Sequence, residues 1–210
     1  MFIGVPKNGS FQQEAIKTYE NTGLDLFGLD TNSRTYNQEV KDAEVYLLRP
    51  QDVPWAFFNG EIDSGVTGYD LLIEYTLGED VEADTPQYEV LMDYLLGEQS
   101  KQETSVYEEL GFGDVEIVFA TGDRDILRED AVSVATSYPN IAEEYLSNKF
   151  EDYDLVEAEG SVEVFPQFDS IDGVVEVVDS GTTIDENSLE VIDTLFESEA
   201  VLLGDLDDEL

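Results

Sequence analysis

The residues best suited to chemistry in this chain lie where an apolar run ends. The run closes at Val177 and Val178, and Asp179-Ser180-Gly181-Thr182-Thr183 then leads into a predicted helix. Backbone amides at a helix start, together with Ser and Thr hydroxyls, can hold a phosphate without a lysine. Gly181 lets the backbone come close to a ligand. An ordinary strand-to-helix turn with a hydroxyl cap fits the same residues, so both interpretations stay open at this point.

The charge of the chain makes an anion site unexpected. The sequence has 50 Asp and Glu residues against nine Lys and Arg, a formal net charge of −41 at pH 7. Nucleic acids and anionic membranes are bound by clusters of Lys and Arg, so we expect neither as a partner. An acidic decoy that imitates DNA is one interpretation. We favour adaptation to concentrated salt, as in a halophile, because the acidic residues are spread between good core patterns and salt screens their repulsion.

Length and composition indicate a folded protein of one large domain or two small lobes. The chain has 210 residues, of which 41% are hydrophobic, and this is enough to bury a substantial core. It has no cysteine, no recognisable signal peptide and no window approaching the roughly 20 apolar residues that a membrane helix needs. These features predict a cytoplasmic protein without disulfides or thiolate metal sites.

Hydrophobic patterning predicts strands that alternate with helices. Short apolar runs predict strands over 2–5, 45–48, 115–120, 132–135, 155–158 and 173–178. Helical spacing predicts helices over 11–21, 53–59, 88–96 and 141–149. This alternation is typical of an α/β fold with largely parallel sheets. The acidic stretch 78–105 has the weakest pattern.

Seven segments together resemble one known family. They are VPKNG at 5–9, LLRPQDVP at 47–54, GEIDSGVTGYDLL at 60–72, LGFGDVEIVFA at 110–120, VATSYPNIAEEYL at 134–146, EGSVEVFP at 159–166 and EVVDSGTTIDEN at 176–187. In this order they resemble the motifs of ATP phosphoribosyltransferase, the first enzyme of histidine biosynthesis. The last segment resembles the family's phosphoribosyl-pyrophosphate loop. Each motif is weak alone, and the set covers nearly the whole chain.

The resemblance implies an architecture. The family has two α/β lobes joined by a hinge, like a type II periplasmic binding protein, with the active-site cleft between the lobes. By analogy, lobe I is 1–112, lobe II with the phosphoribosyl-pyrophosphate loop is 113–189, and 190–210 return to lobe I and end in an acidic tail. The length fits the short form, which lacks the C-terminal regulatory domain. Short forms imply a homo-oligomer and a separate regulatory subunit that resembles histidyl-tRNA synthetase.

The resemblance also implies a reaction and a set of site residues. The reaction is transfer of the phosphoribosyl group from phosphoribosyl pyrophosphate to N1 of ATP, giving phosphoribosyl-ATP and pyrophosphate. Mg²⁺ would be held mostly by the pyrophosphate, with no metal site in the protein itself. The implied roles are 5-phosphate binding by Ser180, Gly181, Thr182 and Thr183, ribose binding by Glu176 and Asp179, phosphate contacts by Lys7 and Arg49, catalysis near the ribose by Glu163, and further substrate contacts by Thr67, Gly68 and Asp70.

Several of these residues also have ordinary structural interpretations. Lys7 fits a surface lysine at a turn, and Arg49 fits an ion pair with a nearby carboxylate. Glu163 and Asp70 fit helix caps. Thr67 and Gly68 fit a turn.

The chain also departs from the family at positions that usually carry a basic residue. Ser10, Glu116, Glu143 and Glu144 stand there instead. Loss of these cations keeps a second hypothesis open, a catalytically weak or silent binding or regulatory protein with the same two-lobe cleft. A solute-binding protein would share the fold but should carry an export signal.

Overall fold

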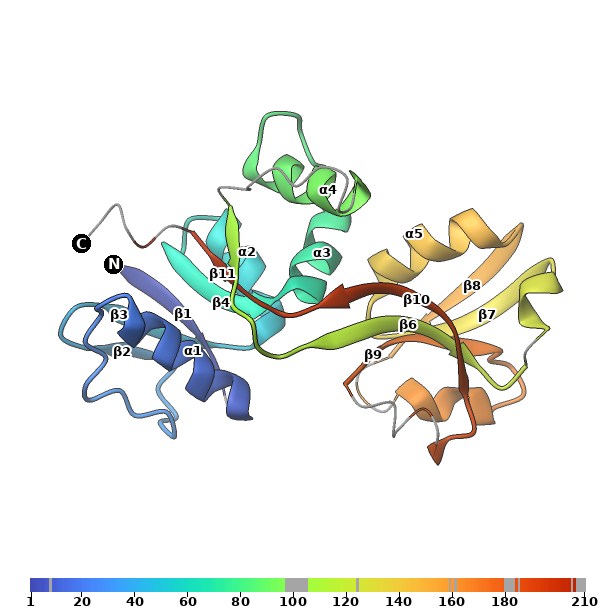
Figure 1. Ribbon diagram of the computed structural model, residues 1–210, viewed down its shortest axis with the longest axis horizontal. Helices are drawn as coiled ribbons and strands as arrows, with labels where there is room; N and C mark the ends of the chain where they lie inside the picture. The colour runs from blue at the N-terminus through green and yellow to red at the C-terminus, as the bar shows by residue number, and fades with distance from the viewer. Residues whose placement is uncertain are drawn as a thin grey trace. The chain divides into compact units, whose positions relative to one another are not determined.

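The structure forms two compact units. It is a computed structural model that describes residues 1–7, 9–96, 106–123, 125–158, 160, 162–179, 184, 186–204 and 206, without the side chains of 9 and 10. Unit 1 comprises Met1–Gly113 with Glu199–Leu210, and unit 2 comprises Asp114–Ser198. Each unit has its own sheet with helices packed on it (Figure 1). The predicted α/β class with two lobes is therefore confirmed.

Unit 1 is built on a six-stranded mixed sheet. Its order is β2-β3-β1-β4-β11-β5, with bounds β2 Asn37–Glu39, β3 Glu44–Leu48, β1 Phe2–Pro6, β4 Ser64–Gly68, β11 Ala200–Leu203 and β5 Tyr107–Glu109. Strands β3, β1 and β4 are parallel to one another. The three remaining strands pair antiparallel. Its helices are α1 Gly9–Asn21, the 3₁₀ turn η1 Pro50–Asp52, α2 Val53–Phe58, α3 Tyr69–Leu77 and α4 Pro86–Leu96.

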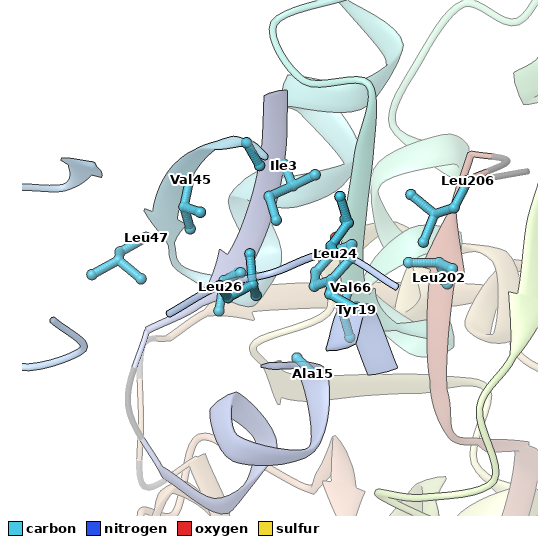
Figure 2. Close-up of a cluster of buried hydrophobic side chains, with 12 residues drawn as sticks. Ile3, Ala15, Tyr19, Leu24, Leu26, Val45, Leu47, Val66, Leu202 and Leu206 are labelled. Carbon is cyan, nitrogen blue, oxygen red and sulfur yellow. The ribbon is translucent and has the colours of Figure 1, made fainter. Parts of the chain in front are cut away.

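Apolar side chains from both ends of the chain make the core of unit 1. Figure 2 shows Ile3, Val45 and Val66 from neighbouring strands together with Leu202 from β11. Tyr19 of α1 is fully buried in the same cluster, and its hydroxyl donates to the Gly4 carbonyl at 3.1 Å. A buried polar group needs such a partner. The core thus fixes α1 on the central strands, and with it the turn at Lys7.

Unit 2 is built on a five-stranded mixed sheet. Its order is β10-β6-β9-β7-β8, with bounds β10 Glu190–Ser198, β6 Val115–Thr121, β9 Gly173–Val178, β7 Ala131–Thr136 and β8 Asp152–Glu157. Strands β9, β7 and β8 are parallel, whereas β6 and β10 are antiparallel. Helix α5 Pro139–Lys149 and the 3₁₀ segments η3 Ile126–Arg128 and η4 Val162–Gln167 complete the unit.

The predicted strands and helices are present, within a few residues of their expected ends. The expectation of largely parallel sheets was wrong, because each sheet carries antiparallel strands beside its parallel core. Hydrophobic patterning predicted neither strand β4 nor helix α3. The pattern misses β4 because its residues are small and rich in glycine. A Cβ on Gly65 would come within 2.5 Å of Val53 Cγ1, so close packing of α2 needs glycine in this strand.

The chain returns to unit 1 later than residue 190. Strand β10, Glu190–Ser198, pairs antiparallel with β6 along its whole length and so belongs to unit 2. The Tyr145 hydroxyl of α5 donates to Asp193 Oδ2 of β10 at 2.7 Å, which ties the strand to its own unit. The return begins at Glu199, and β11 follows it. Within the described ranges, none of the helices combines the length and the hydropathy needed to cross a membrane.

Candidate functional site

Two predicted site residues lie side by side at one edge of the unit 1 sheet. Lys7 directly follows β1, and Arg49 directly follows the parallel strand β3. The register pairs Pro6 with Leu48, and the Lys7 amide donates to the Leu48 carbonyl at 2.7 Å. Ligands of α/β proteins bind at the carboxyl ends of parallel strands. Gly68 ends β4 at this same edge, so three predicted site residues converge here.

The basic residues of the chain differ in how they are paired. The structure describes every Lys and Arg except Lys101 and Arg124. Four of them pair with carboxylates: Lys17 with Glu14 at 2.6 Å, Lys41 with Asp25 at 3.1 Å, Arg128 with Asp125 at 2.6 Å and Lys149 with Asp193 at 3.0 Å. Among the described residues, Lys7, Arg34 and Arg49 form no ion pair. The alternative of an Arg49 ion pair is thus not supported.

Tyr36 joins the two cations at this edge. The Lys7 ammonium lies over the Tyr36 ring, with Nζ 3.8 Å from the ring centroid. Hydrogen bonding with Lys7, the charge of Lys7 and, more weakly, the charge of Arg49 lower the pKa of the Tyr36 hydroxyl. Sequence patterns predict no role for Tyr36 or Arg34. The scarcity of cations could have pointed to Arg34, one of only four arginines.

Thr67 and Gly68 have structural roles at this sheet edge, and their contacts there do not present their groups to a ligand. The Thr67 side chain is fully buried, and its hydroxyl donates to the Pro50 carbonyl at 2.8 Å. This bond holds the η1 turn that begins directly after Arg49. Gly68 precedes α3 and has no space for a Cβ, because the Asp70 carboxylate packs against it. Asp70 is buried in the first turn of α3, where the helix dipole favours a negative charge.

The unit 2 sheet gathers a second group of polar residues at the carboxyl ends of its parallel strands. Ser137 follows β7, and Glu176 and Asp179 lie at the end of the neighbouring strand β9. The Ser137 hydroxyl lies 2.8 and 3.1 Å from the two Glu176 carboxylate oxygens, and the Val177 amide donates to Oε1 at 2.9 Å. These bonds hold the Glu176 carboxylate in a defined place. Asp179 is exposed at the strand end.

Glu163 lies in the first turn of η4 and is half-buried. The segment packs on β9, and Val162 and Phe165 from it join the hydrophobic cluster of unit 2. The Gln167 amide donates to Asn187 Oδ1 at 3.0 Å. Both ends of η4 are thereby held, and Glu163 belongs to this fixed segment. Ser137 and Gln167 are supporting residues that sequence patterns did not single out.

The predicted 5-phosphate residues, Ser180 to Thr183, lie outside the described residues. Their flanks are described: Val178 before the loop and Ile184 after it pack in the same hydrophobic cluster. The cluster therefore fixes the two described residues that flank 180–183.

The four positions that lack the family's basic residue are exposed or peripheral where they are described. Glu116 is exposed on β6, and Glu143 is exposed on α5. The Glu144 carbonyl accepts from Asn148 Nδ2 at 2.7 Å, an ordinary helix-surface contact. The side chain of Ser10 lies outside the described part of the chain.

No group of three or more carboxylate, His or Cys side chains in the described ranges is arranged to hold a metal ion. Mg²⁺ prefers phosphate and carboxylate oxygens and retains several waters. The oxygens of a bound polyphosphate suit such an ion.

The fold and the site define the class of the protein. It has two α/β units, each of which places polar or charged groups at the carboxyl ends of parallel strands. A chain of the Thermotoga maritima "ATP phosphoribosyl transferase (HisG:HisZ) complex" has the same fold, with a TM-score of 0.71, 23% identity and coverage of 97% of this chain and 87% of that one.

The family follows from the sequence comparison. The family described as HisG, ATP phosphoribosyltransferase, matches residues 49–208. The chain belongs to the ATP phosphoribosyltransferase family. It is 31% identical over 209 residues to an ATP phosphoribosyltransferase of Methanothermobacter thermautotrophicus. That match covers 96% of this chain and 63% of the relative. The chain is 28% identical over 212 residues to that of Methanopyrus kandleri, covering 98% and 65%. The chain thus spans less than two thirds of these curated relatives.

Proposed function

We propose that this protein transfers the phosphoribosyl group of phosphoribosyl pyrophosphate to N1 of ATP, the first step of histidine biosynthesis. The bond from C1 of the ribose to the pyrophosphate oxygen breaks, and a bond from C1 to N1 of adenine forms. Pyrophosphate leaves with its electron pair, and Mg²⁺ held by its oxygens would stabilise the departing negative charge. The activity is that of a glycosyltransferase. With these substrates, the proposal places the protein in the cytoplasm.

One observation beyond family membership carries the proposal. In a chain of charge −41, a surface cation is surrounded by carboxylates, and four described cations are indeed paired with them. Lys7 and Arg49 stay unpaired among the described residues although they neighbour each other at a sheet edge. Two adjacent cations without carboxylate partners suit a di- or triphosphate, which offers the missing negative charge.

The proposal gives each predicted residue a role. Lys7 and Arg49 bind the pyrophosphate or the phosphates of ATP, and Arg34 is a third cation of unit 1 that forms no ion pair among the described residues. The buried Thr67 hydroxyl and Gly68 keep the Arg49 turn and the start of α3 in place. Asp70, at the same sheet edge, contacts the substrate through its carboxylate.

Unit 2 supplies the ribose-phosphate contacts in this proposal. The amides and hydroxyls of Ser180 to Thr183 hold the 5-phosphate, as the loop pattern predicts. Glu176 and Asp179 accept hydrogen bonds from the ribose hydroxyls. A carboxylate has about four lone-pair positions, so Glu176 can do this while Ser137 holds it. Glu163 stands near the reacting ribose, where a carboxylate stabilises a developing positive charge.

The test is incubation of the protein with ATP, phosphoribosyl pyrophosphate and Mg²⁺ at low and at molar KCl, following phosphoribosyl-ATP by ultraviolet absorbance. We expect product formation that depends on all three components. Binding of phosphoribosyl pyrophosphate by calorimetry without any turnover would instead support a silent binding or regulatory protein.

Assembly belongs to the same proposal. The similar Thermotoga maritima chain comes from a HisG:HisZ complex, and we propose a homo-oligomer that associates with a regulatory subunit resembling histidyl-tRNA synthetase. Light scattering in concentrated salt tests the first part, and a strictly monomeric protein at all concentrations would contradict it.

A further inference from the structure

Tyr36 is an exposed aromatic residue with a defined place. Its side chain is 58% exposed, and its carbonyl accepts from the Leu47 amide at 2.7 Å, which fixes its backbone beside β3. The Lys7 ammonium lies over the ring face at 3.8 Å from the centroid. An aromatic face attracts a cation electrostatically within about 6 Å. Packing does not explain so exposed a ring, and in the part of the chain that the structure describes its ring contact is with Lys7.

The other described lysines are held in a different way. Lys17, Lys41 and Lys149 each contact a carboxylate at 2.6 to 3.1 Å. Lys149 also lies 5.5 Å from the Tyr145 ring centroid, but there Asp193 neutralises it. A carboxylate partner orients an ammonium and cancels its charge, whereas an aromatic ring orients it and leaves the net charge unchanged.

We propose that Tyr36 is a positioning residue that holds the Lys7 ammonium at the carboxyl edge of the unit 1 sheet without neutralising it. Lys7 then presents its full positive charge to a pyrophosphate or triphosphate group. The inference rests on the proposed role of Lys7 in phosphate binding. It adds the reason why, in so acidic a chain, this lysine is not captured by a carboxylate: the place next to the ammonium is taken by a ring.

A second cation acts on the same ring. Arg49, together with Lys7, lowers the pKa of the Tyr36 hydroxyl, which agrees with the geometry of the strand ends that carry the two cations. Tyr36 thus lies within the positive field of both residues. A carboxylate at position 36 would therefore oppose the positive potential of Lys7 and Arg49 most strongly.

The first experiment measures the affinity for inorganic pyrophosphate with Mg²⁺ by titration calorimetry. Tyr36→Phe keeps the ring and loses only the hydroxyl, so it should bind more tightly than Tyr36→Leu and stay closer to the parent. Tyr36→Leu removes the ring and should weaken binding about two- to fivefold, the size of an exposed cation–π contact. Tyr36→Glu adds a carboxylate beside Lys7 and should weaken binding further, roughly tenfold or more.

Matched controls use Phe27, another exposed aromatic residue of unit 1, with 89% exposure. Phe27→Leu removes a ring, and Phe27→Glu adds the same charge where the described ring contacts place no cation over the ring and where the nearby Lys41 is paired with Asp25 at 3.1 Å. Both should bind pyrophosphate like the parent. If Phe27→Glu weakens binding as much as Tyr36→Glu, general repulsion explains the effect and the inference is wrong.

The second experiment detects the contact itself and needs no ligand. In protein with isotope-labelled lysine, the Lys7 ε-methylene protons should be shifted upfield by the ring current in the parent and in Tyr36→Phe. They should return to the ordinary lysine position in Tyr36→Leu. An unshifted Lys7 signal in the parent would overturn the inference whatever the protein catalyses.

A double-mutant cycle with Lys7→Met separates this inference from the proposed function. We expect Lys7→Met to weaken pyrophosphate binding, and Tyr36→Leu to add nothing further in the Lys7→Met background. A loss in Lys7→Met with no loss in Tyr36→Leu contradicts the role of Tyr36 and leaves the proposed function intact. Unchanged binding in Lys7→Met contradicts the phosphate role of Lys7 and removes the inference with it.

Discussion

The two units build the same kind of sheet edge and equip it with opposite chemistry. Each places three parallel strands side by side, β3, β1 and β4 in unit 1 and β8, β7 and β9 in unit 2. At the edge of unit 1 stand Lys7 and Arg49, unpaired among the described residues. At the edge of unit 2 stand the carboxylates of Glu176 and Asp179 and a predicted loop of hydroxyls and amides.

The two units differ more in how their cations are paired than in how many cations they have. In unit 2, Lys149 and Arg128 are paired with Asp193 and Asp125, so among its described residues every Lys and Arg side chain has a carboxylate partner. In unit 1, a ring holds Lys7, and its charge remains. We infer that unit 1 binds phosphate through side-chain charge and unit 2 through backbone geometry.

Salt should give the largest effect and sharpen this comparison. Self-repulsion of a chain with charge −41 destabilises the compact state in dilute buffer, and the Debye length falls to about 3 Å at 1 M salt. We expect the melting temperature to rise steeply from low to molar KCl. Across the range in which the protein is folded, its affinity for Mg²⁺-pyrophosphate should fall. A melting temperature independent of KCl would contradict the salt-adapted interpretation.

Blocking the close approach of a phosphate to the unit 2 backbone should give the next largest loss of affinity. Gly181→Val puts a β-branched side chain where the 5-phosphate must meet the loop, so several charge-assisted hydrogen bonds are lost together. We expect binding of phosphoribosyl pyrophosphate to weaken by about 100-fold or more. Calorimetry measures it, with Gly122→Val as control, since a Cβ at Gly122 meets nothing closer than the Ser188 carbonyl at 3.8 Å. Equal losses in both variants would deny the loop a special role.

Removal of charge in unit 1 should reduce activity strongly, whereas the same change in unit 2 should not. Arg49→Met removes the cation that we propose contacts a phosphate, a contact worth about 1.5–3 kcal/mol or roughly 10- to 100-fold in kcat/KM. Arg128→Met breaks only an exposed pair with Asp125, and kcat/KM should stay within about twofold. Steady-state kinetics in concentrated KCl compares the two. Similar losses in both variants would break the distinction between the units.

A single hydroxyl of the loop should matter less than the glycine. Thr183→Ala removes one donor to a charged acceptor, and we expect a loss of about 1.5 kcal/mol in affinity for phosphoribosyl pyrophosphate, roughly tenfold. The melting temperature without ligand should hardly change, because a solvated hydroxyl contributes little to stability. Thr194→Ala, at an exposed residue of β10, serves as the control. Unchanged affinity in Thr183→Ala would favour an ordinary helix cap.

The smallest effect concerns stability of unit 2. A hydrogen bond from Tyr145 and a further one from Lys149 lower the pKa of Asp193, so its carboxylate stabilises the fold above the unfolded pKa of about 3.9. Asp193→Asn should lower the free energy of unfolding by about 1 kcal/mol at neutral pH. Because protonation removes the same contribution from the parent, the difference should shrink as the pH falls below about 4.

Urea unfolding at two pH values measures this difference. Asp125→Asn, which loses only the exposed pair with Arg128, should be nearly neutral at both. A difference between parent and Asp193→Asn that grows toward acid pH would contradict the assigned sign.

The sequence by itself determined the local parts of this protein. Apolar runs such as 115–120 and 173–178 become strands because their residues suit a buried sheet, and Pro or Gly ends them. The turn after β9 and the two cations after β1 and β3 could be located, because each directly follows an apolar run. The family could be recognised because its motifs are short and contiguous.

Only the tertiary structure decided which distant groups meet. Ser137 holds Glu176 across 39 residues, Thr67 holds Pro50 across 17, and Tyr36 lies under Lys7 from a separate segment. Strand β10 stays with unit 2 because it pairs with β6. Such pairings depend on sheet order and register, and hydrophobic periodicity carries no information on either. Lys17 and Arg128 pair with carboxylates three positions away, but the Lys149–Asp193 pair and the contact of Lys7 with Tyr36 join distant segments, so the contrast between the two edges became visible only in the fold.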